Sequence, residues 1–309
     1  MLNVGFIGLG SMGGAMARSI TRHLPSLHAT HSSLLNVYDH SPDTLSKFAA
    51  SNKSTPHPSP NLVFSNSSLV FICLPTTSIV KSVLVESQSS ISQNSIIVDC
   101  TSGDPGESKE LGQFVEKTLD AKYFDMPVSG GRAGALASTL TAMVGGNKKI
   151  LETEVAQVAS SFASNIVHVG EEHGAGCAVK SVNNSLNMLN LLSTAEGLVA
   201  LKNFGVDPSD ALKCINNSSG RSLQSTVRIP DEVLTNDFDY GFFLSLMRKD
   251  CGIGSKFIHS YFPKNEGIID RLNEVTLKCE AGVGMDGEVD YTVAVRHLEK
   301  LGGVELRKN

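Results

Sequence analysis

The feature that most constrains the fold is a change of pattern near residue 174. Before it, short apolar runs alternate with segments whose apolar residues recur at helical spacing. Short runs rich in β-branched residues are typical of strands buried on both faces of a parallel sheet, and their alternation with helices predicts an α/β fold. The predicted strands are residues 2–7, 34–38, 69–73, 95–99, 122–125 and 140–144, and the predicted helices are 12–23, 41–50, 76–86 and 107–118. Two segments rich in Ser, His, Pro, Thr and Asn, residues 24–33 and 51–60, are predicted to be surface loops.

After the change, the pattern is helical almost throughout. Residues 174–204 predict one helix of roughly 45 Å, at 1.5 Å per residue. It is apolar on most faces, so we expect it to be buried; its apolar positions are Val179, Val182, Leu186, Leu189, Leu192, Ala195, Leu198 and Val199. Further helices are predicted near 208–217, 222–236, 242–260, 265–281 and 290–301. We therefore expect a parallel-sheet domain over residues 1–173 and an all-helical domain over 174–309, with their junction near Gly170 to Gly176 and the long helix between them.

Composition excludes several classes of protein. A chain of 309 residues suggests about two domains. The net charge of −5 gives no basic stripe for nucleic acid, and no apolar run reaches the roughly 20 residues of a membrane span. The six cysteines form no CxxC pair, so we expect reduced thiols. The first predicted strand follows Met1 directly, so we expect a cytoplasmic protein, or a mitochondrial one whose presequence has been removed.

A glycine string follows the first predicted strand. Gly8-Leu9-Gly10-Ser11-Met12-Gly13 has the spacing GxGxxG and opens a predicted helix. In this pattern the first glycine permits a tight turn, the second lets a diphosphate approach the backbone, and the third packs helix against strand. The free N–H groups at the start of the helix also favour phosphate. The string predicts a dinucleotide site, with a glycine-rich turn that binds nothing as the alternative.

The second predicted strand leads to Asp39, which stands 26 residues after Gly13. The usual spacing is about 20 residues, and the polar segment 24–33 can absorb the excess. A carboxylate here accepts hydrogen bonds from the ribose hydroxyls and repels a 2′-phosphate, which predicts NAD rather than NADP. The next residue, His40, could contact a 2′-phosphate weakly. The alternative for Asp39 is a simple cap on the next helix.

Four motifs follow one another along nearly the whole chain: Gly5 to Gly13, Asp125-Met126-Pro127-Val128-Ser129-Gly130-Gly131, Gly174 to Asn184, and Lys249-Asp250. Together they resemble the β-hydroxyacid dehydrogenase family. The resemblance implies a Rossmann-type domain followed by an all-helical domain, an NAD-dependent dehydrogenase of valine catabolism, and a homodimer or homotetramer; the long apolar helix is expected to supply an oligomer interface. The chain departs from the family in the longer segment before Asp39 and in Cys251-Gly252-Ile253-Gly254, where the family more often has Leu-Gly-Leu-Ala.

The resemblance also implies the substrate site. Ser129, Gly130 and Gly131 would bind the substrate carboxylate, and two glycines after a strand do leave backbone N–H groups exposed to an anion. From the residues alone, an ordinary loop without a ligand is an equally good interpretation of this segment. Lys180 would be the general acid and base, and Asn184, four residues on and so on the same helix face, would position the substrate.

Lys180 carries the chemistry in this interpretation. A lysine can exchange the proton of the substrate hydroxyl if burial lowers its pKa toward neutrality. A lysine on a helix is usually a solvated surface charge, but the apolar surroundings in the sequence favour a functional role. The resemblance also implies weaker assignments, and each of these residues could instead be a plain loop or surface residue. They are Leu74 and Pro75 beside the cofactor, Thr101 and Ser102 on its nicotinamide side, and Lys249 near both cofactor and substrate.

The predicted function is NAD-dependent oxidation of a small 3-hydroxy acid, similar to 3-hydroxyisobutyrate, to its semialdehyde. Within the class, the alternative is a semialdehyde or glyoxylate reductase that uses NADPH, against which Asp39 argues. A non-catalytic nucleotide-binding scaffold is the alternative from another class, and the presence of both Lys180 and Asn184 argues against it. No HExxH motif or cluster of metal ligands occurs in the sequence, so we expect no metal and no metal-dependent hydrolase. Neither nucleic acid nor membrane is expected as a partner.

Overall fold

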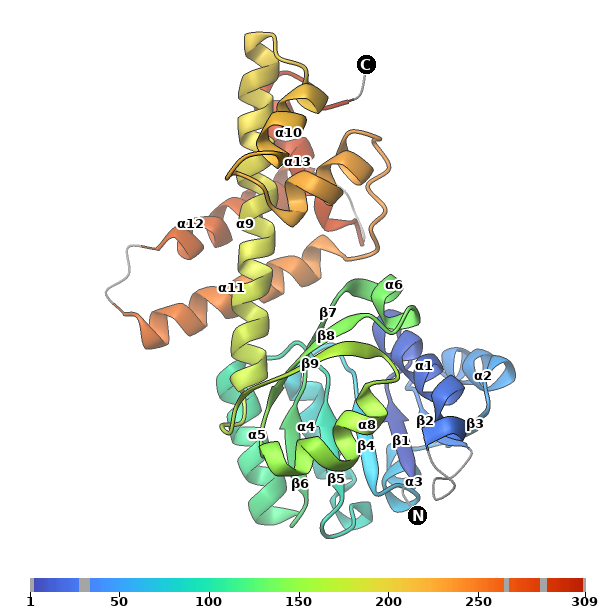
Figure 1. The fold of residues 1–309 in the computed structure, drawn as a ribbon. Helices are drawn as coiled ribbons and strands as arrows, with labels where there is room; N and C mark the ends of the chain where they lie inside the picture. Colours follow the sequence, from blue (N-terminus) through green and yellow to red (C-terminus); the bar gives the residue numbers. More distant parts are fainter. Residues whose placement is uncertain (1–2, 28–33, 264–266, 284–287, 308–309) are drawn as a thin grey trace. The chain divides into compact units, whose positions relative to one another are not determined.

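The computed structural model describes residues 3–27, 34–263, 267–283 and 288–307 (Figure 1). Its contacts divide the chain into two compact units, Met1–Lys180 and Ser181–Asn309, each of which is described by itself. Three parts of the sequence predictions lie outside the described residues: Leu2, residues 28–33 of a loop, and residues 265–266 of a helix.

The first unit is built on a twisted sheet whose strands follow the order β3-β2-β1-β4-β5-β6-β8-β7, with β9 pairing to β8. From β3 to β6 all neighbours are parallel, which confirms the predicted α/β architecture. The strands are β1 (Val4–Ile7), β2 (Leu35–Tyr38), β3 (Ser54–Pro56), β4 (Leu69–Ile72), β5 (Ile96–Asp99), β6 (Lys122–Asp125), β7 (Val128–Ser129), β8 (Leu140–Gly145) and β9 (Ala163–Gly170).

The sheet departs from the prediction at one edge, where it is mixed rather than parallel. β8 runs antiparallel to both β6 and β7, and β9 is parallel to β8. Only residues 130–139 connect β7 to β8, which is shorter than the dozen or more residues that a parallel crossover requires. The predicted parallel sheet is therefore confirmed from β3 to β6, and it continues as a mixed edge beyond β6.

Both predicted loops contain regular structure. The first helix continues to Leu27, inside the predicted loop 24–33, and β3 lies inside the predicted loop 51–60. β3 is an edge strand of three residues, two of them polar and the last a proline, so it lacks the apolar run that marks a buried strand. Edge position explains why its sequence resembles a loop.

Helices cover both faces of this sheet. Successive residues of a strand point to opposite faces, so the strands contribute side chains to two separate cores. Phe6, Phe71 and Phe124 belong to one core, and Ile7 and Ile72 belong to the other. The helical elements are α1 (Ser11–Leu27), α2 (Pro42–Ser51), α3 (Pro60–Ser65), α4 (Thr77–Glu86), the 3₁₀-helix η1 (Gln88–Ser90), α5 (Pro105–Thr118), α6 (Gly131–Leu136), α7 (Lys148–Ile150), the π-helix η2 (Leu151–Val155) and α8 (Ala156–Ala159).

The second unit is helical, as predicted. Its longest helix is α9, which begins in the first unit and is drawn as the long helix in Figure 1. Among the described residues of this unit, the β-pairing is a single bridge between Phe243 and Asp290. The helices are α9 (Ala175–Phe204), α10 (Pro208–Asn216), the π-helix η3 (Gln224–Val233), α11 (Leu244–Tyr261), α12 (Ile268–Val283), the 3₁₀-helix η4 (Tyr291–Ala294) and α13 (Val295–Gly302).

Burial of α9 is less complete than its sequence predicts. Leu192, Ala195, Leu198 and Val199 are buried in the core of the second unit. Leu186, in contrast, is 48% exposed, and Val179 is 41% exposed, so the predicted burial of this helix is wrong for these two positions. No helix in the described part of the chain is long and apolar enough to cross a membrane.

Candidate active site

The glycine string forms the turn between β1 and α1. Gly8 has a φ of +94°, and a Cβ there would meet the carbonyl oxygen of Cys73, while a Cβ on Gly13 would meet the carbonyl of Gly8. Gly10 differs, because a Cβ on it would meet nothing within 4 Å. Two glycines thus close the turn and the third leaves open space at the start of α1, where a diphosphate would need it.

Asp39 holds this turn from the end of β2. Its Oδ2 accepts a hydrogen bond from the N–H of Leu9 at 2.6 Å, and its Oδ1 accepts one from the N–H of Ser41 at 2.8 Å. The residue that caps α2 is Ser41, whose hydroxyl accepts from the N–H of Thr44 at 3.3 Å. The alternative that Asp39 is merely the helix cap is therefore wrong. Its contact with a ribose stays a prediction.

A cavity of about 460 Å³ adjoins the turn and is lined by residues of α1, α2 and α6. Gly10 and Ser11 form part of its wall, together with the cations Arg18, Lys47 and Arg132. No carboxylate is among the described residues that line it. Three positive charges beside the start of a helix favour an anionic ligand. The sequence prediction missed these cations because they come from three helices far apart in the chain.

The turns after β4 and β5 are joined by hydrogen bonds. The N–H of Leu74 donates to Oγ1 of Thr101 at 3.1 Å, and the N–H of Thr101 donates to Oδ1 of Asp99 at 2.9 Å. Thr101 is buried, Ser102 is half-buried and Pro75 is exposed. The structure therefore brings Leu74 and Thr101 together at the carboxyl ends of neighbouring parallel strands, the edge at which such sheets bind ligands.

Ser129, Gly130 and Gly131 form the turn from β7 into α6. Gly130 has a φ of +127° and Gly131 a φ of +68°, in the region that favours glycine over other residues. Ser129 pairs with Thr141 of β8, and Gly130 stands at the N-cap of α6. The backbone itself thus requires both glycines. Binding of a substrate carboxylate to this turn stays a prediction.

Lys180 and Asn184 lie one turn apart on α9, and both are buried. Lys180 is 9% exposed, which is rare for a lysine, and Asn184 is 3% exposed. Asn184 belongs to the second unit, where its Nδ2 donates to Oδ2 of Asp250 at 2.6 Å. Lys249 forms an ion pair with Oδ1 of the same carboxylate at 3.2 Å. The structure therefore joins Asn184 and Lys249 through Asp250.

The close approach of α11 to α9 in this unit depends on a glycine. A Cβ on Gly254 would meet the hydroxyl of Ser185 and the carbonyl of Ser181. Gly254 is one of the positions at which the chain departs from the family pattern in sequence. A Cβ at this position would require the hydroxyl of Ser185 to move, so the glycine fits the close packing of α11 against α9 next to Asp250 and Asn184.

Comparison with known proteins identifies the family. Residues 3–170 match the family model of the NAD binding domain of 6-phosphogluconate dehydrogenase, and residues 174–261 match that of the NAD-binding region of NADP-dependent 3-hydroxyisobutyrate dehydrogenase. The 2-(hydroxymethyl)glutarate dehydrogenase of Eubacterium barkeri is 33% identical over 99% of this chain and 97% of its own length. Human mitochondrial 3-hydroxyisobutyrate dehydrogenase is 34% identical over 81% of this chain and 74% of its own length. The chain belongs to the 3-hydroxyisobutyrate dehydrogenase family.

The fold agrees with this membership. A 3-hydroxyisobutyrate dehydrogenase of Mycobacterium tuberculosis, solved with L-serine, superposes with a TM-score of 0.85 at 24% identity, covering 96% of this chain and 99% of the other. As a member of the 3-hydroxyisobutyrate dehydrogenase family, the protein is an oxidoreductase of the hydroxyacid dehydrogenase kind that uses NAD or NADP. The residues fit such a cofactor, because Gly10 leaves space at the start of α1 and the adjoining cavity is cationic.

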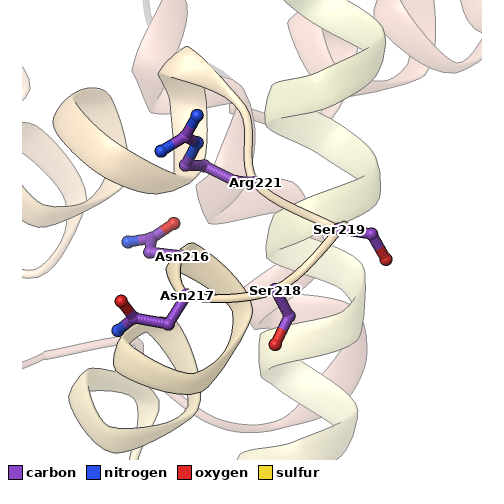
Figure 2. A pocket seen from close by; sticks show the side chains of 5 residues that line it. All are labelled: Asn216, Asn217, Ser218, Ser219 and Arg221. Atoms are coloured by element: carbon purple, nitrogen blue, oxygen red, sulfur yellow. The ribbon is translucent and has the colours of Figure 1, made fainter.

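A second cavity, of about 470 Å³, contains none of the predicted site residues. Figure 2 shows that it is lined by the end of α10 and the loop that follows, with the side chains of Asn216, Asn217 and Arg221 extending to the same side. Asn216 uses its Nδ2 to donate to the carbonyl of Ser225 at 2.9 Å, which ties the loop to η3.

Three buried carboxylates near the predicted site residues were not singled out in the sequence. Asp250 and Asp125 lie in two of the motifs that resemble the family but have no role assigned from the sequence, and Asp250 accepts a hydrogen bond from Asn184. Asp99 and Asp125 each end a buried strand, and an acidic residue directly after an apolar run is a signal that could have identified them. Burial raises the pKa of each of these two carboxyls to about 6.

Proposed function

We propose that the protein oxidises a small 3-hydroxy acid to its semialdehyde with NAD, and that Lys180 is the general acid and base. The observation that carries the proposal is a lysine only 9% exposed, one helical turn from a buried asparagine that a carboxylate holds in place. Burial of a lysine carries a large cost, so a buried lysine beside a buried, hydrogen-bonded asparagine favours a functional role.

The proposed roles follow from what each group can do. Lys180 in its neutral form accepts the proton of the substrate hydroxyl, and in the reverse direction its ammonium returns that proton. Asn184 donates or accepts a hydrogen bond at the substrate, with its amide oriented by Asp250. Ser129, Gly130 and Gly131 offer backbone N–H groups to the substrate carboxylate. Bound NAD supplies the hydride acceptor, and Gly8 to Gly13 with Asp39, Leu74, Pro75, Thr101 and Ser102 are the residues proposed to hold it.

The substrate class can be narrowed by chemistry. The names of the relatives above include 3-hydroxyisobutyrate, 2-(hydroxymethyl)glutarate and, as a bound molecule, L-serine. All three share a primary alcohol two carbons from a carboxylate and differ in the substituent between them. We therefore propose a 3-hydroxypropanoate core as the recognised group, with the carboxylate on Ser129–Gly131 and the hydroxyl at Lys180.

Absorbance of NADH during incubation with these three acids tests the proposal. Turnover of at least one of them with NAD is expected. Turnover of only 2-hydroxy acids, under conditions where NAD binds, would contradict the 3-hydroxy acid assignment. Glycolate serves as a matched control, because it carries the alcohol and the carboxylate one carbon closer together.

A second candidate is a semialdehyde or glyoxylate reductase that uses NADPH. The cations Arg18, Lys47 and Arg132 beside Gly10 favour it, because they would attract an additional phosphate. Asp39 opposes it through repulsion of a 2′-phosphate. Affinities of NADH and NADPH, measured by fluorescence titration, separate the two: tighter NADPH binding would favour the reductase.

We also propose that the protein is a homodimer or homotetramer that associates through α9. Leu186 is 48% exposed, and Ser193, Gly197 and Ala200 on later turns are exposed small residues against which a second helix could pack. Light scattering on the purified protein should give twice or four times the 32.8 kDa chain mass. A monomer mass at assay concentration would contradict the proposal.

A further inference from the structure

Two buried carboxylates stand side by side where β5 and β6 end. Asp99 and Asp125 are in register on these neighbouring strands, and they are 1% and 0% exposed. Asp99 accepts hydrogen bonds from the hydroxyl of Tyr123 at 3.0 Å and from the N–H of Thr101. Asp125 has a different pair of partners, Gly174 directly before α9 and Cys177 in its first turn.

Asp125 caps the helix that carries Lys180. Its Oδ1 accepts from the N–H of Gly174 at 2.7 Å, and its Oδ2 accepts from the N–H of Cys177 at 2.8 Å. N–H groups in the first turn of a helix have no partner within the helix, so they need an acceptor from elsewhere. A charged acceptor makes these bonds short and strong. Cys177 is three residues before Lys180, so the carboxylate acts within one helical turn of the proposed base.

The packing leaves this carboxylate little freedom. A Cβ on Gly145 would meet its Oδ1, and a Cβ on Gly176 would meet its Oδ2. Cys177 is fixed in addition by Ser108 of α5, with 3.4 Å between Sγ and Oγ. The first turn of α9 is therefore held by rigid elements of the first unit, with Asp125 as the group that accepts its N–H bonds.

The charge state of Asp125 depends on its surroundings. Burial raises its pKa to about 6, and the N–H groups of Cys177 and Gly174 and the nearby His173 offset part of that increase. The other titratable groups that face it are Asp99, Tyr123 and the Cys177 thiol. At neutral pH both oxygens are acceptors, whereas protonation converts one of them into a hydroxyl and weakens one of the two bonds.

We propose that Asp125 is a positioning residue, which fixes the first turn of α9 and thereby sets where the amine of Lys180 stands. The proposal rests on the proposed role of Lys180 as acid and base. Misplacement of a reacting group by about 1 Å can cost about 10²-fold in rate, so a loosened helix start should lower kcat far more than the affinity for NAD.

The test is Asp125→Asn, which keeps the shape but replaces one acceptor oxygen with an NH₂ group that opposes a backbone N–H. We expect kcat to fall at least about tenfold, the KM for NAD to change less than about threefold, and hydrogen exchange of residues 174–180 to accelerate. The matched control is Asp207→Asn in the second unit, where the carboxylate caps α10 by accepting from Ser209 and Asp210. It should leave kcat unchanged.

The outcomes separate the proposal from its premise. A kcat within about twofold of the wild type, or faster exchange spread over the whole first unit, would overturn the positioning role. A third outcome combines faster exchange of Asp125→Asn, confined to residues 174–180, with full activity of Lys180→Ala. It would show that Asp125 holds the start of α9 but would overturn the proposal that this placement serves catalysis. If Asp125→Asn does not fold, wild-type exchange at about pH 5.5 and 7.5 is decisive. Release of the first turn of α9 breaks the two N–H bonds that lower the pKa of Asp125, while β6 keeps the carboxyl buried, so this local opening is favoured at lower pH even though global unfolding is not. Corrected for intrinsic rates, exchange of residues 174–180 should therefore be faster at the lower pH, and equal or slower exchange would overturn the proposal.

Discussion

The two buried carboxyls of the first unit predict an unusual pH dependence of stability. The pKa of Asp125 is raised by burial from 3.8 to about 6 in the folded protein, and the pKa of Asp99 is raised in the same way. Between these values the folded state binds more protons than the unfolded state. The contribution of each group to stability is therefore fully present below about pH 4 and is lost as pH rises through about 6.

The magnitude follows from the size of the shift. A change of about two pKa units corresponds to about 3 kcal/mol between fully protonated and fully ionised conditions, of which about 2 kcal/mol is lost between pH 4.5 and 7. Asparagine at position 125 does not titrate, so a comparison with Asp125→Asn isolates the contribution of this one residue. Asp99 is present in both proteins, and its contribution largely cancels.

The assay is urea unfolding of both proteins at pH 4.5 and pH 7, followed by far-UV circular dichroism. Because the chain has two compact units, hydrogen exchange of β5 and β6 identifies the transition that belongs to the first one. We expect the free energy of unfolding of the wild type, minus that of the variant, to fall by about 2 kcal/mol from pH 4.5 to pH 7. A difference that is independent of pH, or that rises with pH, would refute the reasoning.

Three further substitutions test the site. Asp39→Arg should move the ratio of kcat/KM for NAD and NADP toward NADP by at least about tenfold, and an unchanged ratio would mean that Asp39 does not contact the ribose. Gly10→Ala should keep the wild-type melting temperature but weaken NAD binding. Gly13→Ala should lower the melting temperature, because its Cβ would collide with the Gly8 carbonyl. Equal melting temperatures of the two variants would contradict these assignments. Asn184→Ala should raise the KM for the hydroxy acid and destabilise the protein by about 1–3 kcal/mol in a urea titration, since it removes a donor from a buried carboxylate. An unchanged KM together with an unchanged free energy of unfolding would argue against the role of Asn184 in positioning the substrate.

Much of the fold could be predicted from the sequence because its strands are buried and its long helix is strongly periodic. The predicted boundaries of β6 and α4 differ from the structure by at most one residue. The elements that were missed have weak local signals. β9 has mostly exposed or half-buried residues, including Asn165 and His168, and β7 has two residues, so neither forms an apolar run.

The candidate site also has parts with a local sequence signal and parts without one. The glycine string is local, so its spacing alone predicts the turn that the structure contains. The partners of its residues are distant in sequence: Leu9 is bonded to Asp39, and Asn184 is bonded to Asp250. Such pairs depend on how strands and helices pack, which residue spacing does not encode. The same holds for Asp125, whose hydrogen bonds with the start of α9 connect residues about fifty positions apart.

The most direct test of the central claim is the rate of NAD reduction by Lys180→Ala with the best hydroxy acid substrate of the wild type. Lys202→Ala, at the far end of the same helix, is the control. We predict that kcat falls at least about 10²-fold in Lys180→Ala, while the affinity for NAD measured by titration stays within about threefold and Lys202→Ala remains fully active. Near-normal kcat in Lys180→Ala would contradict the assignment of this lysine as the general acid and base.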